Sequence, residues 1–429
     1  MSRATTNARF TPSWPEILPE ILTLCPPARL LVPLSHRGGG DIIAKPPGTF
    51  VHAGDKLAIK DDELSHVPLA PLDGTLGLAR EAHLTTGRLV PAVELMVAPE
   101  QSPAPIESSV VDEPTLVGWI DRMRNGGVGA DRIASPDLID QLHLAVGRGA
   151  QRVVCTILDA DAGMRLNALL AVHHGPHIVL GLERLRVATG AETAQLVVEA
   201  FASPTWADPV RKAAEAARME IIELTNDYPQ SDPTLIHYTL GAGRLRPGAS
   251  PATLGVILLD AAAALAVGDL LAGKPALTTP AAVNDHLQHR THLLNVPIGT
   301  QISDLLAALH IPSEGVVLRG GDLLRDIRLT PDAVLGSGEL TLHVTLPEPV
   351  RSPQPCVRCG WCLEACPTRV QPAGVLEAAQ RGDYQMAERA GLHACIECGL
   401  CTYVCPSRLP LLESIRWWRG LAADTELRR

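Results

Sequence analysis

Eight of the ten cysteines in this 429-residue chain form two copies of one pattern near its C-terminal end. The pattern is C-x2-C-x2-C-x3-C-P, and it begins at Cys356 and again at Cys395. Thiolates at this spacing are ligands of 4Fe–4S clusters, whose chemistry is the uptake and release of single electrons. The sequence therefore predicts two such clusters in a protein that transfers electrons.

The fourth cysteine of each run is expected to serve the cluster of the other run, as in two-cluster ferredoxins. By this rule cluster 1 has the ligands Cys356, Cys359, Cys362 and Cys405. Cluster 2 has the ligands Cys395, Cys398, Cys401 and Cys366. Disulfide frameworks are typical of short secreted chains, and zinc sites are built from C-x2-C pairs, so neither explains the repeated run.

Further residues accompany the cysteine runs. Five arginines around them could offset the charge of the clusters: Arg351, Arg358, Arg369, Arg408 and Arg416. The segment 411–419, with its tryptophans and arginines, is expected to be a helix that either docks a partner or packs against the cluster segment. The isolated Cys25 and Cys155 are expected to be small buried hydrophobic residues.

Length and composition bound the class of protein. A chain of 429 residues exceeds what one core supports, so we expect several domains. Aromatic residues make up only 3% of the chain, so aliphatic side chains must build the cores. The net charge of −10 argues against a nucleic-acid-binding protein, which needs a basic face. The most apolar window, 253–273, contains Asp260 and Asp269, so no transmembrane segment is expected.

The first part of the chain has the pattern of a small β domain. After an N-terminal segment, 1–28, residues 29–98 alternate short apolar runs with Gly and Pro, which predicts closely spaced strands. The stretches VHAGDKL at Val51 and APLDGTL at Ala70 resemble a biotinyl- or lipoyl-type barrel-sandwich domain. The hairpin where such carriers present a lysine has no Met-Lys pair here, so we expect a structural module. Residues 99–114, rich in Pro, Ser and acids, are expected to be a linker.

The middle of the chain alternates strand and helix patterns, which is typical of an α/β domain with a largely parallel sheet. We expect this Rossmann-like domain at residues 115–290. Its buried strands are predicted at 152–158, 177–182 and 194–200, and one of its helices at 260–272.

Three segments complete the predicted organisation. A small mixed module is expected at 291–348, with a helix at 302–309. A helical two-cluster ferredoxin domain follows at 349–420, and 421–429 form a polar tail. The predicted fold class is therefore multidomain α/β.

Three stretches carry a resemblance to a known family: LNVPIGT at 294–300, VVLRGG at 316–321 and CIECGLCTYVCPS at 395–407. With the order of the segments, they resemble RnfC, the NADH-facing peripheral subunit of Rnf ion-translocating electron-transport complexes. PduS-type cobalamin reductases share this order, and the central parts are similar to the flavin subunit of respiratory complex I and to NqrA. The resemblance implies that 291–348 form a soluble-ligand-binding β-grasp (SLBB-like) module.

The same resemblance implies a cofactor loop. In the family, a loop of the form G-x-G-G-x-G-F-P holds flavin and nicotinamide phosphates through backbone N–H groups. The matching stretch keeps Gly126, Gly127 and Gly129, but Arg124 replaces the leading glycine and 130–131, an Ala-Asp pair, replaces Phe-Pro. The aspartate would place negative charge beside a bound phosphate, so we expect this site to be lost or heavily remodelled.

A second family motif, an acidic loop after a strand, aligns with Asp159 and Asp161. The Asn-Gly start and the Pro-Tyr end of that motif are missing here. Binding of FMN and NADH through the three glycines and these two aspartates therefore stays as an alternative to a remodelled site.

The function favoured by the sequence is electron transfer through two 4Fe–4S clusters, as a subunit of an Rnf-like oxidoreductase assembly. The expected partners are other subunits of a membrane-associated complex and a redox protein that donates or accepts electrons. Two alternatives stay open: an FMN-dependent NADH:acceptor oxidoreductase of the PduS type, and an iron–sulfur scaffold subunit. Cysteines without disulfide partners suit a reducing compartment, so we expect a cytoplasmic protein, peripheral on the inner face of the cell membrane.

Overall fold

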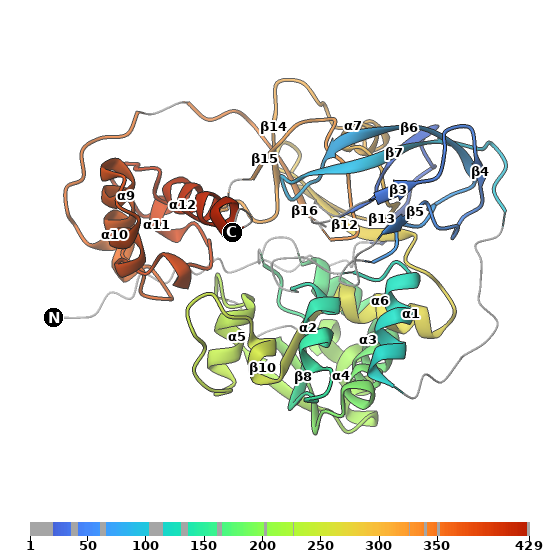
Figure 1. Ribbon diagram of the computed structural model, residues 1–429, viewed down its shortest axis with the longest axis horizontal. Helices are drawn as coiled ribbons and strands as arrows, with labels where there is room; N and C mark the ends of the chain where they lie inside the picture. Colours follow the sequence, from blue (N-terminus) through green and yellow to red (C-terminus); the bar gives the residue numbers. More distant parts are fainter. Residues whose placement is uncertain are drawn as a thin grey trace.

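The computed structural model describes most of the chain (Figure 1). The described residues are 20–35, 42–60, 66–102, 115–129, 136–160, 165–200, 204–225, 227–325, 327–338, 341–349 and 352–426. Most of the expected linker, from residue 103 onward, and the last three residues of the tail lie outside this set. The α/β region forms the lower half of Figure 1, the β regions lie above it, and the cluster segment lies at one end. The mixed α/β, multidomain class is confirmed.

The α/β region is built on a four-stranded parallel sheet in the order β10-β9-β8-β11. Its strands are β8 (Arg152–Thr156), β9 (Thr193–Glu199), β10 (Glu220–Leu224) and β11 (Val256–Asp260). Its helices are α1 (Leu116–Asn125), α2 (Leu138–Ala145), α3 (Leu166–Thr189), α4 (Pro204–Ala216), α5 (Pro233–Thr239) and α6 (Ala261–Leu271), with the 3-10 helix η1 (Pro251–Leu254).

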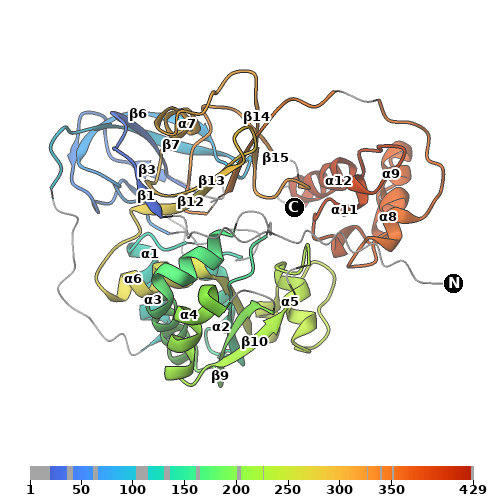
Figure 2. The ribbon, with the colours of Figure 1, turned by 180° about the vertical axis from the view of Figure 1, so that it is seen from behind.

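Helices cover both faces of this sheet, which explains why its strands read as continuous apolar runs. Val153 and Cys155 of β8 pack into a core with the long helices, whereas Val154 packs on the other face with Ile236 of α5. Figure 2 shows the strands from behind, with α4 in front of the sheet and α5 beside β10. The expected burial of Cys155 is confirmed, but Cys25 is exposed, contrary to expectation.

The strand predicted at 177–182 is wrong. These residues lie within α3, which continues past Pro176 with a kink at His174. A short apolar run bounded by Gly and Pro does not by itself distinguish a buried strand from a segment of buried helix. Here the run is helical because α3 lies between α4 and α6 and is buried along much of its length.

The first β region contains a four-stranded antiparallel sheet and a two-stranded one. The larger sheet has the order β2-β7-β6-β4, and β3 pairs with β5. The strands are β2 (Arg29–Pro33), β3 (Ile42–Ala44), β4 (Phe50–Val51), β5 (Ala58–Lys60), β6 (Gly74–His83) and β7 (Leu89–Val97). Alternating residues such as Leu30, Val32, Val93 and Leu95 form the core between the two sheets.

The second β region is a six-stranded mixed sheet in the order β1-β13-β12-β16-β14-β15. The strands are β1 (Ile21–Thr23), β12 (Thr278–Asp285), β13 (Arg290–Pro297), β14 (Val317–Gly320), β15 (Ile327–Leu329) and β16 (Thr341–Thr345), and helix α7 (Ile302–Ala308) packs on the sheet. β12 and β13 form a hairpin that passes through the domain boundary predicted at residue 290. β1, from the predicted N-terminal segment, extends the same sheet.

The cluster segment is helical, as predicted. Its elements are α8 (Trp361–Glu364), α9 (Pro372–Arg381), α10 (Tyr384–Arg389), η2 (Leu392–Ala394), α11 (Leu400–Tyr403) and α12 (Leu411–Glu426). Ile415 and Trp418 of α12 are buried against α9 and α10, whereas Trp417 is half exposed. The apolar face of the tryptophan helix is thus used for packing within the segment. Among the described residues, no helix combines the length and apolarity needed to cross a membrane.

Candidate iron–sulfur centre

The two cysteine runs fold in the same way. Between the first two cysteines of each run lies a residue in the left-handed region, Arg358 at φ 53° and Glu397 at φ 56°. The second cysteine is followed by a glycine with positive φ, Gly360 at 81° and Gly399 at 77°, which begins a short helix. These turns reverse the chain over a few residues. The result is the tight wrap that three neighbouring ligands of one cube require.

Cys366, the last cysteine of the first run, lies with the second run. Together with Cys395, Cys398 and Cys401 it lines one cavity. The apolar side chains of Ile396, Leu412 and Ile415 line the same cavity. A cavity with four thiols and an apolar wall fits the donor set and surroundings of a 4Fe–4S cluster.

The last cysteine of the second run, in turn, lies with the first. Burial raises the pKa of Cys362, and the neighbouring Cys359 and Cys405 raise it further. Cys356 and Cys359 are exposed. Cys366 thus lies with three cysteines of the second run, and Cys405 lies near Cys362 of the first, so the last cysteines of the two groups are exchanged.

The two groups differ in their exposure to solvent. Cys398 and Cys401 are buried, each 7% exposed. Burial raises the pKa of Cys395 to about 11 and those of Cys398 and Cys401 to about 12. Since iron binds thiolates, the binding of a cluster by the cysteines of the second group requires the release of protons from buried thiols. The backbone N–H groups of Glu397 and Val370 donate to the sulfurs of Cys395 and Cys366, each at 3.3 Å.

No three His, Cys, Asp or Glu side chains in the described ranges converge to hold a single metal ion.

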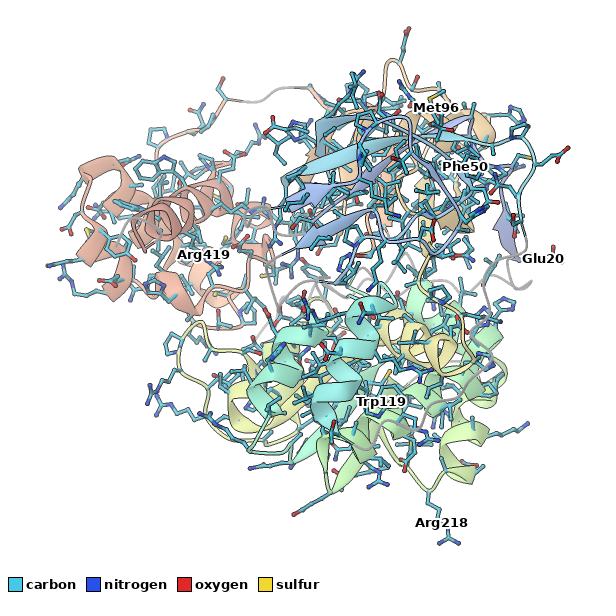
Figure 3. The ribbon with its side chains drawn as sticks, turned by 45° about the vertical axis from the view of Figure 1, so that its right-hand side comes forward. Glu20, Phe50, Met96, Trp119, Arg218 and Arg419 are labelled. Carbon is cyan, nitrogen blue, oxygen red and sulfur yellow. The ribbon has the colours of Figure 1, made fainter. Side chains whose placement is uncertain are left out.

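Side chains from outside the cysteine runs hold the second run, and no sequence pattern indicated most of them. Arg419 of α12 donates to the carbonyl oxygen of Cys395 and pairs with Glu397, and Arg416 also pairs with Glu397. Figure 3 labels Arg419 on the cluster segment. Arg325, from the β14–β15 turn, and Tyr228, from the β10–α5 loop, also reach the run. Of the five arginines expected around the clusters, Arg416 is therefore engaged at the second run, and residue 351 lies outside the described residues.

The glycine-rich loop after α1 does not have the form of a phosphate cradle. The N–H groups of Gly126, Gly127 and Val128 donate to carbonyl oxygens of α1 at 2.9 to 3.2 Å. They are therefore not directed at an open site.

Side chains also fill the space beside each glycine of this loop. A Cβ atom at Gly126 would collide with Leu270 of α6, and one at Gly129 would lie 2.6 Å from Nδ1 of His66. These glycines permit close packing between the α/β region and the first β region. Residues 130–131 lie outside the described residues.

Asp159 follows β8 and caps a helix. Its carboxyl oxygens accept hydrogen bonds from the N–H groups of Asn167, at 2.7 Å, and Ala168, at 3.4 Å, in the first turn of α3. An anionic cofactor group would use such N–H groups, and here a side chain already occupies them. Arg165 and Asp260 lie near Asp159, and Glu199 lies near Arg165, so the described charges here are mostly acidic. Asp161 lies outside the described residues. The described residues at this end of the sheet therefore do not fit an FMN or NADH phosphate.

We expect Asp159 to make stability depend on pH. Burial raises its pKa from 3.8 to about 7, so the folded state favours the protonated carboxyl. The protonated Asp159 carboxyl makes its full contribution to the free energy of unfolding at pH values below 3.8, the ordinary pKa. This contribution is lost as the pH rises through about 7. Asp159→Asn, which keeps an acceptor for the helix, should remove this loss. Urea unfolding between about pH 5 and about pH 8 measures it, and parallel profiles for both proteins would contradict the assignment.

The fold and the cysteine groups define a class: a multidomain α/β chain with a 4Fe–4S dicluster ferredoxin domain. Residues 348–407 match the family model described as 4Fe-4S dicluster domain. The curated relatives are RnfC subunits of ion-translocating oxidoreductase complexes. The chain is similar to these subunits over part of its length.

Three relatives carry this likeness. The RnfC subunit of the Na(+)-translocating ferredoxin:NAD(+) oxidoreductase complex of Acetobacterium woodii is 25% identical over 246 residues, 56% of each chain. The RnfC subunit of the ion-translocating oxidoreductase complex of Rhodobacter capsulatus is 33% identical over 42% of this chain and 35% of its own length. The RnfC subunit of the proton-translocating ferredoxin:NAD(+) oxidoreductase complex of Clostridium ljungdahlii is 24% identical over 49% of this chain and 47% of its own. The matches thus span about half or less of these relatives.

Among solved structures, an NAD+-reducing nickel–iron hydrogenase in its air-oxidized state aligns with 73% of this chain and 56% of its own. The TM-score is 0.43 and the sequence identity 15%.

Proposed function

We propose that this chain is an electron-transfer subunit that relays electrons through two 4Fe–4S clusters within an Rnf-like oxidoreductase assembly. The observation that carries the proposal is the exchange of the fourth cysteines, Cys366 into the second group and Cys405 into the first. Two-cluster ferredoxins hold two cubes near one another by this exchange. The dicluster match at 348–407 and the RnfC relatives support it.

The proposed ligands follow the two cysteine groups. Cluster 1 is assigned to Cys356, Cys359, Cys362 and Cys405. Cluster 2 is assigned to Cys395, Cys398, Cys401 and Cys366. We also assign 29–98 as a barrel-sandwich domain, the parallel-sheet region as the Rossmann-like domain related to the complex I flavin subunit, and the mixed sheet with α7 as the SLBB-like β-grasp module.

The difference in exposure gives the two clusters different roles. Cluster 2 lies against the rest of the chain, and cluster 1 faces solvent through the exposed Cys356 and Cys359. Val357 and Trp361, within the first run, are also exposed. We assign cluster 1 to exchange with a redox protein, within an assembly on the inner, cytoplasmic face of the cell membrane.

The second candidate function, an FMN-dependent NADH:acceptor oxidoreductase, needs phosphate sites in the α/β region. The occupied N–H groups at Gly126, Gly127 and α3 disfavour it. Electrons are therefore assigned to enter from a partner protein and not from NADH bound to this chain.

The iron content tests the cluster assignment. After anaerobic purification and reconstitution, we expect about eight irons per chain, four for each cube. Fewer than roughly six irons per chain would contradict two complete clusters.

A test of reduction by NADH distinguishes the proposed electron-transfer subunit from an FMN-dependent NADH:acceptor oxidoreductase. We expect dithionite to bleach the cluster absorption, and NADH to leave it unchanged in a protein without a flavin band. A flavin band together with bleaching by NADH would favour the oxidoreductase and contradict the relay supplied by a partner.

A further inference from the structure

The loop between the first two cysteines of the second run is held from several parts of the chain. The carbonyl oxygen of Ile396 accepts from Nη1 of Arg325 at 3.0 Å. That of Cys398 accepts from the Tyr228 hydroxyl at 2.5 Å. Arg325 belongs to the six-stranded-sheet region and Tyr228 to the α/β region, so both regions contact the same few residues of the cluster segment.

Tyr228 and Arg325 also belong to one buried network. The Tyr228 hydroxyl lies 3.0 Å from Oδ1 of Asp322, and Nε of Arg325 lies 2.8 Å from Oδ2 of the same carboxylate. Asp232, at the start of α5, is 3.8 Å from Nη2 of Arg325.

The backbones of the second cysteine run and of the β14–β15 turn also lie in close contact. A Cβ atom at Gly399 would collide with the carbonyl oxygen of Leu324, in the β14–β15 turn. The equivalent Gly360 of the first run has nearly the same φ, 81° against 77°, but a Cβ atom there would meet nothing within 4 Å. The two runs have the same local fold but different surroundings. The second run packs against the β14–β15 turn at Gly399, whereas Gly360 of the first run faces open space.

Arg416 joins this contact to α12. Its Nη1 donates to the carbonyl oxygen of Arg325 at 2.8 Å, while its Nε pairs with Glu397 at 3.0 Å. The docking contact is thus polar, buried and distributed over three regions. Buried polar groups of this kind fix one arrangement, because every alternative leaves donors or charges without partners.

We propose that Tyr228, Asp322 and Arg325 form a latch that docks the second cysteine run against the α/β and six-stranded-sheet regions and fixes the position of cluster 2 within the relay. The proposal extends the proposed function, on which its electron-transfer part rests. Cluster 2 becomes the inner cluster, held at a fixed place, and cluster 1 the outer one. The three latch residues are positioning residues, which act on the cluster through the ligand loop.

The two glycines provide a matched pair of variants. Gly399→Ala and Gly360→Ala carry the same backbone strain, since both residues have positive φ, but only the first meets Leu324. The readout is hydrogen–deuterium exchange at the Arg325 amide, which donates to Asp322 at 2.9 Å. We expect exchange there to rise in Gly399→Ala and to stay unchanged in Gly360→Ala. Equal exchange in both variants would overturn the latch.

Tyr228→Phe tests the latch without strain in a ligand loop. It removes one hydroxyl from the contact with Cys398 and Asp322. In the reconstituted protein, we expect unchanged iron content and a shift in the reduction potential of one cluster alone, because hydrogen bonding around a cluster sets its potential. Unchanged potentials for both clusters, with unchanged exchange at Arg325, would overturn the proposal.

The two readouts separate the latch from the function on which it rests. Low iron content in the unaltered protein would contradict the two-cluster function, yet the exchange difference between the glycine variants would still support docking. Full iron content with no difference between Gly399→Ala and Gly360→Ala would contradict the latch alone.

Discussion

Cys398→Ser is expected to reduce the iron content from about eight to about four per chain, because it removes one ligand of a four-iron site. The remaining cluster should be cluster 1, whose assigned ligands do not include Cys398. Electron transfer through the chain should then fail, since the proposed relay needs both clusters.

This variant also separates a relay from a scaffold. Lost electron transfer with normal assembly into the complex would support a relay. Failed assembly would support the alternative in which the clusters act as structural staples. Cys25→Ser is the control, because Cys25 is exposed and lies outside both runs, so iron content and electron transfer should not change. Equal iron loss in the two variants would contradict the ligand assignment.

Arg325→Met is expected to lower the free energy of unfolding by about 3–5 kcal/mol, the usual cost of removing one partner from a buried ion pair. Asp322 and Asp232 are buried, and Arg325 is the cation beside both. The methionine keeps an unbranched apolar stem, so the loss reflects mainly the positive charge that no longer offsets the two carboxylates. Urea unfolding at neutral pH measures it.

The control and the pH dependence distinguish this mechanism from simple loss of packing. Arg381→Met removes an exposed pair with Glu377 on α9 and should cost less than about 1 kcal/mol. Burial already raises the pKa of Asp232, and Arg325 lowers it. Without Arg325 this pKa rises further, so protonation at acidic pH should relieve part of the loss. A destabilisation that does not depend on pH would contradict the electrostatic explanation.

The Cys398 and Arg325 predictions concern different parts of the site. Replacement of Cys398 acts on a ligand, whereas Arg325 acts through the loop that carries the ligands. A further difference is expected in iron content, because Arg325→Met leaves all eight assigned cysteines in place. If the folded Arg325 variant keeps about eight irons, the latch and the ligand set are separable.

The sequence determined the cysteine chemistry and much of the fold. Ligand spacing is local, so two runs of C-x2-C-x2-C-x3-C-P were enough to predict a two-cluster helical segment. The strands at Arg152–Thr156 and Thr193–Glu199 were also predictable, since strands buried on both faces form apolar runs. The same reasoning failed at 177–182, where a buried helix has the same composition as a buried strand.

Tertiary structure decided which residues surround the ligands. Tyr228 and Arg325 lie 170 and 71 residues before the carbonyl groups that they contact, and no local pattern marks such pairs. Tertiary structure also gave Asp159 its role, because a carboxylate becomes a helix cap only when the fold brings α3 to it. Local spacing therefore specified the two clusters, and long-range contacts made one of them the inner cluster and the other the outer.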